Sequence, residues 1–176
     1  MDAASPISAA SDALAGENSA DENSHNSQLH DLIPFVIRDH AFAVFTDQVE
    51  GTVESKPFAP LPRAPAGVIG VACVHGRMLT VLDPAALLES GVASWPRNLP
   101  HVIALRGEEQ FALAAEICRD TITVSAEDIE RGIETKLPAD VAVGLVRYGG
   151  EEILVLDTNK LVSMAVQHKE RRRRRF

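Results

Sequence analysis

The sequence predicts a mainly β protein built from two similar small β units, and three observations support this. First, one phrase occurs twice, at residues 70–83 and 144–157, each time as an apolar run, a glycine turn, a second apolar run and an aspartate. Second, many short apolar runs are separated by turn residues, which is typical of an all-β barrel or sandwich. Third, the phrase repeats at half-domain spacing, with Gly70 and Gly144 lying 74 positions apart. Together these patterns indicate two small barrels side by side.

The first half of the ordered chain alternates strands with connectors. Four prolines between residues 56 and 65 exclude a central strand or helix there, because proline cannot donate a backbone hydrogen bond. Asp83 followed by Pro84 starts a helix, since aspartate caps free N–H groups and proline has none to leave unpaired. The expected elements are strands at 32–38, 41–46, 47–55, 67–74 and 77–82, a connector at 56–65 and a helix at 85–89.

The second half repeats this organisation. Asp157 starts a C-terminal helix that runs through Ala165, as Asp83 starts the first helix. The run from Ser125 to Asp128 resembles a capping box for one helical turn. The further expected elements are a hairpin of 101–105 and 110–116, a strand at 117–124, a connector at 132–140 and strands at 141–148 and 152–156.

Charge is unevenly distributed along the 176 residues, whose formal net charge is −8. Residues 1–31 carry six acids and no Lys or Arg. They have too few large apolar groups to offset ordering entropy, so we expect a disordered acidic tail. Residues 168–176 form a basic tail that contains Arg171 to Arg175. The domain between the tails, 32–167, is acidic, which excludes a nucleic-acid-binding core because such a core presents a basic face to phosphates.

The cysteines and the apolar runs indicate the compartment. Cys73 and Cys118 form no CxxC pair, which indicates buried thiols in a reducing environment. No basic region followed by an apolar stretch marks a signal peptide at the N-terminus. The apolar runs are much shorter than the ~20 residues of a membrane span. We therefore expect a cytoplasmic protein.

Two groups of side chains are candidates for chemistry, and a structural role is favoured for both. Cys73, His75 and Cys118 would form a metal site only if tight ligand pairs were present, which zinc usually requires. Asp83 and Asp157 could act as an acid–base pair, yet helix capping explains both. The chain has no motif for nucleophilic, phosphate-binding or metalloprotease chemistry. We therefore expect no enzyme activity, no metal and no cofactor.

Several motifs fall in the order found in a known family. Residues 61–71 combine a proline connector with an apolar strand, and residues 76–83 follow as a glycine turn, a strand and an aspartate. Residues 42–45 correspond to an earlier hairpin, and residues 153–161 to a final strand and helix. Over roughly residues 32–166, this pattern resembles the CheW-like family of bacterial chemotaxis coupling proteins.

The resemblance implies both a fold and a role. The fold would be two SH3-like five-stranded β-barrel subdomains that share an apolar seam, with short helices and a C-terminal helix. The role would be that of a non-enzymatic adaptor linking the cytoplasmic tip of a chemoreceptor to a histidine kinase, in chemotaxis or pilus-type motility. The regulatory domain of such kinases resembles the same two-barrel fold, so barrel-to-barrel pairing is expected.

The resemblance also gives candidate site residues. The candidate partner-binding residues are Val49, Glu50, Val53, His75, Arg77, Leu113 and Ile117. The structural candidates are Gly70, Gly76, Gly144 and Gly150, with Asp83 and Asp157 as helix caps. We expect Glu50, His75 and Arg77 to set orientation and specificity. The four apolar candidates are placed near the groove between the barrels, and each could instead belong to the core.

Four residues depart from the family pattern, and one of them is Cys73, which stands where the family has asparagine. His75 stands where the family has arginine, which removes a guanidinium fork. Gly51 stands where glutamate is common, and Thr80 where proline is usual. These changes keep a second hypothesis open, in which the fold has lost its usual partners and binds a small ligand or another protein. For Arg171 to Arg175 the alternatives are a solvated tail, a weak contact with an anionic membrane surface, a contact with nucleic acid, and a contact with the acidic N-terminal tail of the chain.

Overall fold

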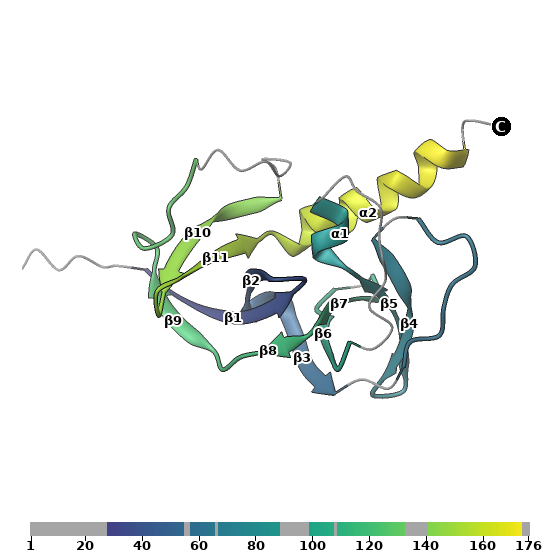
Figure 1. The fold of residues 1–176 in the computed structure, drawn as a ribbon, viewed down its shortest axis with the longest axis horizontal. Helices are drawn as coiled ribbons and strands as arrows, with labels where there is room; N and C mark the ends of the chain where they lie inside the picture. The colour runs from purple at the N-terminus through teal and green to yellow at the C-terminus, as the bar shows by residue number, and fades with distance from the viewer. Residues whose placement is uncertain are drawn as a thin grey trace, which may run out of the picture.

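The computed structural model describes residues 28–54, 57–65, 67–88, 99–107, 109–132 and 141–173. Its strands form two sheets that lie side by side, with the helices along one side (Figure 1). The elements are, in chain order, β1 (Leu29–Ile37), β2 (His40–Phe45), η1 (Thr46–Gln48), β3 (Val49–Glu54), β4 (Val68–Val74), β5 (Arg77–Leu82), α1 (Pro84–Leu88), β6 (His101–Leu105), β7 (Phe111–Ala115), β8 (Ile117–Cys118), β9 (Ile122–Ser125), β10 (Ala142–Tyr148), β11 (Glu151–Leu156) and α2 (Thr158–Arg173).

The strands divide between a central sheet and a terminal sheet. The central sheet contains β3 to β7 in the order β3-β6-β7-β5-β4. The terminal sheet has the order β10-β11-β2-β1-β8, and β9 also pairs with β1. Because β8 and β9 pair with different parts of β1, they share one strand position at the edge of this sheet. The predicted mainly β fold with two β subdomains and few helices is confirmed.

The two copies of the repeated phrase form equivalent strand pairs in different sheets. β4 and β5 are antiparallel, and β5 also pairs in parallel with β7. In the same way β10 and β11 are antiparallel, and β11 pairs in parallel with β2. The hairpin β1–β2 precedes the first copy yet completes the sheet of the second, whereas β6–β7 completes the sheet of the first. The two subdomains are therefore interleaved along the chain, which the repeat alone did not predict.

The equivalence extends to backbone details, each displaced by 74 residues. Both strand pairs contain an irregularity of the β-bulge type. In both, the backbone N–H of the aspartate after the second strand donates a hydrogen bond to the residue just before the first strand. The pairs of features are the bulges at Val68/Gly70 and Ala142/Gly144, and the 2.8 Å bonds from Asp83 N to Gly67 O and from Asp157 N to Val141 O. The two copies are therefore similar in backbone structure as well as in sequence.

A crossing segment explains why the first glycine of each copy is needed. Ala59 forms an isolated bridge with β4 beside Gly70, and Glu130 forms the equivalent bridge with β10 beside Gly144. A Cβ at Gly70 would overlap the carbonyl oxygen of Ala59, and a Cβ at Gly144 would lie 2.6 Å from that of Glu130. Both glycines thus let two backbones approach closely.

The turn and the cap of each copy follow the expected chemistry. His75-Gly76 and Gly149-Gly150 both have positive φ at the two central residues, as the type I′ hairpin turn requires. Asp83 Oδ1 accepts a 2.9 Å hydrogen bond from the N–H of Ala86, and Asp157 Oδ1 accepts one of 3.1 Å from Lys160. Each aspartate therefore caps the helix that follows its strand.

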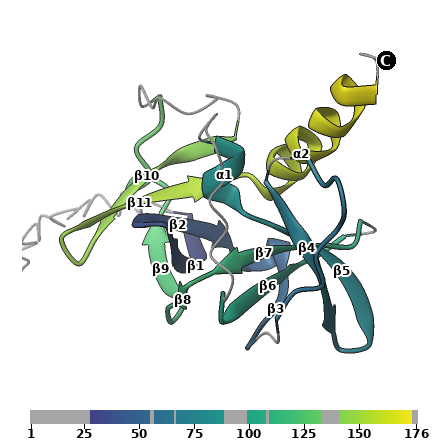
Figure 2. The ribbon, with the colours of Figure 1, turned by 45° about the vertical axis from the view of Figure 1, so that its right-hand side comes forward.

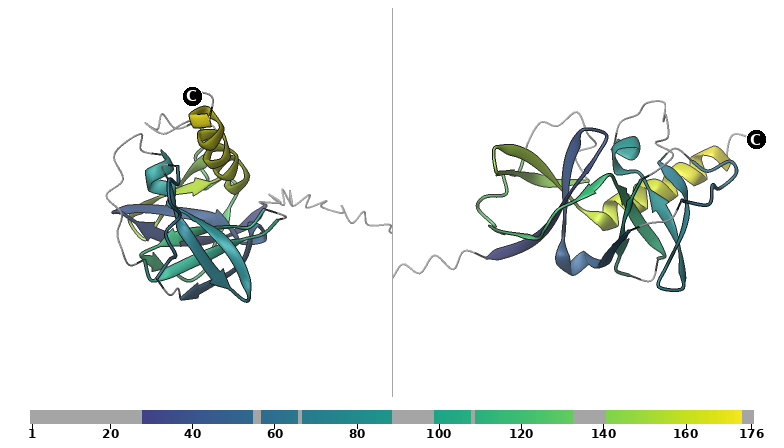
Figure 3. Two further views of the ribbon diagram at one scale, coloured as in Figure 1. Left: turned by 90° about the vertical axis from the view of Figure 1, so that its right-hand side faces the viewer. Right: turned by 60° about the horizontal axis from the view of Figure 1, so that its bottom comes forward.

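One apolar core joins the two sheets. A large cluster of buried side chains draws on both sheets and on α2, and includes Phe35 and Val44 from the terminal sheet, Val81 and Leu113 from the central sheet, and Leu161 from α2. A smaller cluster lies within the terminal sheet. α1 lies beside α2 (Figure 2), and α2 extends from the terminal sheet past the central sheet (Figure 3). The continuous core favours a fixed arrangement of the two subdomains, because separating them would expose apolar surface.

Four predicted boundaries are corrected. β1 begins at Leu29 rather than 32, because residues 29–32 pair with β9. The strand expected at 117–124 is divided into β8 and β9, and residues 126–128 form a turn instead of a helical turn. The turn still has the reciprocal bonds of a capping box, from Ser125 N to Asp128 Oδ2 at 3.0 Å and from Asp128 N to Ser125 Oγ at 3.3 Å. α2 continues to Arg173, so most of the predicted basic tail is helical backbone.

Other predictions lie outside the described residues. These are the acidic tail over residues 1–27, the end of the first helix at 89–91, the connector over 133–140, and residues 174–176. None of the helices in the described part of the chain is long and apolar enough to cross a membrane.

Candidate partner-binding surface

Three of the four apolar candidates face the core. Leu113 is 0% exposed, because its side chain on the central strand β7 packs into the large core cluster. Val49 is 4% exposed, and Val53 is half-buried against the same core. Leu113 and Val49 are therefore unavailable to a partner, which corrects their assignment to the binding surface.

Ile117 is the apolar candidate that faces solvent. Its side chain is 51% exposed, because β8 is a two-residue strand at the edge of the terminal sheet. β8 pairs with β1 through Val36 and Phe35, and within the described part of the chain no strand covers its outer side. An exposed isoleucine at a sheet edge is a suitable contact for a partner, since its burial there would remove apolar surface from water.

Glu50 and Arg77 form an ion pair on the central sheet. Arg77 Nη1 lies 2.6 Å from Glu50 Oε2, and the two side chains are 39% and 45% exposed, respectively. Glu50 belongs to β3 and Arg77 to β5, which would lie about 14 Å apart in a flat sheet with three strand spacings between them. The sheet must therefore curve round on itself, and the ion pair connects its outer strand to the glycine hairpin.

His75 lies in the turn between β4 and β5 and is exposed. Its φ of 48° places it in the left-handed region, which glycine adopts more easily than histidine. The equivalent position in the other copy is Gly149. The imidazole is thus presented at the tip of the hairpin, two residues before Arg77, at some cost in backbone strain.

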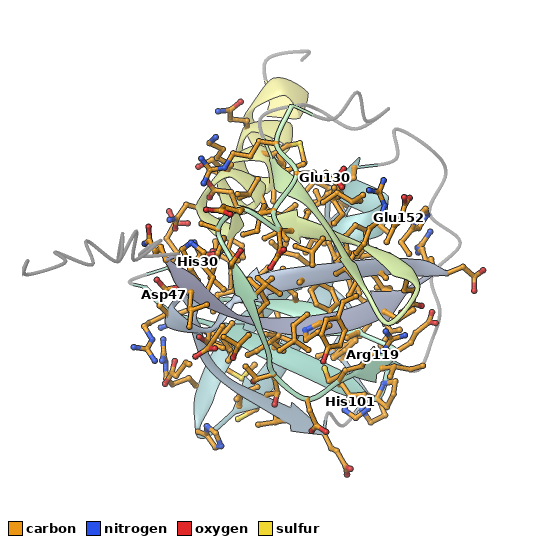
Figure 4. The ribbon with its side chains drawn as sticks, turned by 90° about the vertical axis from the view of Figure 1, so that its left-hand side faces the viewer. His30, Asp47, His101, Arg119, Glu130 and Glu152 are labelled. Carbon is orange, nitrogen blue, oxygen red and sulfur yellow. The ribbon has the colours of Figure 1, made fainter. Side chains whose placement is uncertain are left out.

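A second ion pair, missed from the sequence, lies on the terminal sheet. Arg119 donates from both terminal nitrogens to the two carboxylate oxygens of Glu151, one of the bonds measuring 3.2 Å. The hydrogen bond from Arg119 lowers the pKa of the Glu151 carboxyl. Figure 4 shows Arg119 on the end of the molecule that this sheet forms. Glu151 lies 74 residues after Arg77, which is the one signal that could have pointed to it.

The cysteines differ from their predicted environment. Cys73 is exposed on β4, opposite the exposed Met78 of β5, so the prediction that it is buried is wrong. Cys118 is half-buried, and burial raises the pKa of its thiol from 9.0 to about 11. Among the described residues, no group of three or more His, Cys, Asp or Glu side chains is placed to hold a metal ion.

This contrast predicts selective thiol labelling. At about pH 8, a maleimide should modify Cys73 rapidly and Cys118 much more slowly, because a pKa near 11 makes the thiolate about a hundredfold scarcer than at a pKa of 9.0. Mass spectrometry over time, with Cys73→Ser and Cys118→Ser as single-cysteine references, measures both rates. Equal rates in the folded protein would contradict the burial of Cys118.

One buried ion pair connects the two subdomains. Arg38, in the β1–β2 turn of the terminal sheet, places Nη2 2.8 Å from Oδ2 of Asp83, which follows β5 of the central sheet. Asp83 is 0% exposed, and its other oxygen caps α1. Both oxygens of this carboxylate thus have structural partners, which accounts for a buried acid at this position without a catalytic role. A backbone bond of 3.3 Å from Arg38 N to Glu116 Oε1 holds the same turn.

Comparisons with known proteins agree with this architecture. The family model described as CheW-like domain matches residues 31–166. The chain is 27% identical over 135 residues to the chemotaxis protein CheW of Rhizobium meliloti, covering 74% of this chain and 86% of that protein. It is 24% identical over 144 residues to CheW of Treponema pallidum, covering 78% and 85%.

A solved structure supports the fold. The scaffolding protein TtCheW from Thermoanaerobacter tengcongensis superposes with a TM-score of 0.65 at 14% identity, covering 78% of this chain and 90% of that one. At this identity the likeness concerns the fold. The family model, however, spans nearly the whole described domain. The chain therefore belongs to the CheW-like family of non-enzymatic chemotaxis scaffold proteins.

Proposed function

We propose that this protein couples the cytoplasmic tip of a chemoreceptor to the regulatory domain of a histidine kinase. The observation that carries the proposal is the exposed group Glu50, His75 and Arg77 on a subdomain whose core is continuous with that of its counterpart. A coupling protein needs two binding surfaces in a fixed relative orientation, because a conformational change in one partner must alter the state of the other. The shared core supplies that orientation. Both partners would place the protein in the cytoplasm.

Each subdomain offers a distinct contact. The central sheet presents Glu50, His75 and Arg77, which are charged or polar and suited to orientation. The terminal sheet presents Ile117 at its open edge, which supplies apolar burial and free backbone groups for strand addition. The replacement of the family's arginine by His75 is expected to retune the affinity for a particular partner. The output, flagellar or pilus-type, would be set by which receptor and kinase are bound.

Co-purification tests the proposal. The full chain should bind its cognate receptor and kinase with micromolar affinity or better, measured by calorimetry for each partner. Ile117→Lys should weaken one of the two complexes about tenfold, since a charge replaces buried apolar surface. Val166→Lys is the matched control, because Val166 is also half-exposed but lies on α2.

The outcomes separate the proposal from its alternative. If neither partner binds at micromolar concentration and a small molecule raises the melting temperature instead, the coupling function is wrong and a ligand-binding role replaces it. If both partners bind but Ile117→Lys and Val166→Lys behave alike, coupling stands and the terminal edge is not part of the interface.

A further inference from the structure

The two surface ion pairs occupy equivalent positions with opposite polarity. Arg77 is the first residue of β5 and Glu151 the first residue of β11, and the two lie 74 positions apart in the repeat. Arg77 pairs with Glu50 of the outer strand β3, and Glu151 pairs with Arg119, which directly follows the outer strand β8. A cation on the central hairpin thus corresponds to an anion on the terminal hairpin.

The strand registers support the equivalence of Glu50 and Arg119. β6 and β1 hold the same place in their sheets, each next to the strand that runs parallel to the glycine hairpin. The residue before Glu50 pairs with Leu105 of β6, and the residue before Arg119 pairs with Phe35 of β1. Leu105 follows Ala104, which pairs with Ala112 of β7, and Phe35 follows Pro34, which pairs with Ala43 of β2. Ala112 and Ala43 are equivalent, because their partners in the glycine hairpins are Val81 and Val155, which lie 74 positions apart.

Stability does not explain why both pairs are present. The arginine and glutamate side chains are 39% and 45% exposed in the central pair, and 39% and 47% exposed in the terminal pair. Ion pairs at such exposure contribute little to folding, because water screens the charges and ordering the side chains costs entropy. Two equally exposed pairs with reversed charges are better suited to recognition.

The neighbouring positions reinforce the contrast between the hairpins. On the central hairpin, Cys73 and Met78 face each other across the strands and are exposed. The residues 74 positions later are Arg147 and Glu152, which form an ion pair of 3.2 Å, and Arg147 also pairs with Glu130. The central hairpin is therefore apolar where the terminal hairpin is charged.

We propose that this reversal makes the two subdomains bind different partner surfaces, with Glu50 and Arg77 as the specificity-determining residues of the central one. The central surface accepts a partner that places a base against Glu50, an acid against Arg77 and an apolar side chain against Met78. The same partner surface is rejected by the terminal subdomain, where it would face Arg119 and Glu151 with like charges. The inference rests on the proposed coupling function, and it explains how two similar subdomains avoid competing for one partner.

A charge exchange that preserves the ion pair tests this. The variant Glu50→Arg/Arg77→Glu keeps a pair at the site but reverses its polarity, and Arg119→Glu/Glu151→Arg does the same on the terminal sheet. The first variant should bind one partner, receptor or kinase, at least about tenfold more weakly, because like charges then face each other. The second variant should leave that complex within about twofold of the unaltered protein.

Melting temperature and salt dependence complete the test. Both variants should melt close to the unaltered protein, and the affinity lost by the first should shrink as salt is raised, because screening weakens like-charge repulsion. If the first variant binds both partners as the unaltered protein does, or if both variants lose the same partner equally, the inference is overturned while coupling stands. If the unaltered protein binds neither partner, the coupling function itself fails, and the inference with it.

Discussion

Replacing Arg38 with methionine is expected to destabilise the protein by about 3 kcal/mol, because it leaves a buried carboxylate without its cation. Asp83 is fully buried, and the 2.8 Å ion pair with Arg38 is its contact with the other subdomain. The methionine can fill much of the volume of the arginine stem, so the loss of stability reflects the missing charge more than lost packing. Urea denaturation followed by fluorescence or circular dichroism measures the change.

The matched control is Arg63→Met. Arg63 is exposed and has a φ of 58°, close to the 53° of Arg38, so the same substitution is made on the same kind of backbone without a buried acid. We expect a change within about 0.5 kcal/mol there. A double variant Arg38→Met/Asp83→Asn should recover part of the loss, because asparagine still caps α1 and carries no charge. If Arg38→Met is as stable as Arg63→Met, the buried pair does not hold the subdomains together.

The pH dependence of the Arg38→Met variant gives an independent check. Burial raises the pKa of the Asp83 carboxyl above 3.8, while the hydrogen bond from Ala86 and the charge of Arg38 lower it. The folded state therefore holds this proton more tightly than the unfolded state, and the associated stability is lost as pH rises through the folded pKa. Without Arg38 the folded pKa is higher still. The stability difference from the unaltered protein should thus narrow as the pH falls from neutral, because the carboxyl of the variant takes up its proton first.

The local features of this fold could be predicted from the sequence because each depends on neighbouring residues. The glycine turns, the caps at Asp83 and Asp157 and the strand pairs around Gly76 and Gly150 are set by residue types within a few positions. The family pattern then gave the two-subdomain architecture. These predictions required no knowledge of which strands meet across the molecule.

The long-range features could not be obtained in this way. The interleaving of the subdomains depends on β2 pairing with β11 and β7 with β5, and apolar alternation does not name a strand's partner. The same gap hid the burial of Leu113, which depends on β7 lying in the middle of its sheet. The pair of Arg119 with Glu151 was missed for the same reason, since the repeat locates Glu151 but Arg119 follows β8, outside the repeated phrase.

Adding a methyl group at Gly70 or Gly144 is expected to cost about 3 kcal/mol, because in each case the new Cβ would overlap a backbone carbonyl that cannot rotate away. At Gly144 it would meet the carbonyl oxygen of Glu130 and Cγ2 of Ile129, both at 2.6 Å. Relief requires the crossing segment to move, which would break the paired hydrogen bonds between Glu130 and Leu145, of 2.8 and 2.9 Å.

Gly51→Ala is the matched control, because a Cβ there has nothing within 4 Å and its φ lies outside the left-handed region. That variant should be neutral, or more stable by a few tenths of a kcal/mol, since alanine reduces the entropy of the unfolded chain. Denaturation midpoints of the three variants test the comparison, and the yield of refolded protein is used if Gly70→Ala or Gly144→Ala does not accumulate. Equal midpoints for Gly70→Ala and Gly51→Ala would mean that the crossing segment moves aside without a loss of stability. The first glycine of each copy would then be needed only for the β-bulge. A similar loss of stability at Gly70 and Gly144 would instead show that the same close backbone contact stabilises both subdomains.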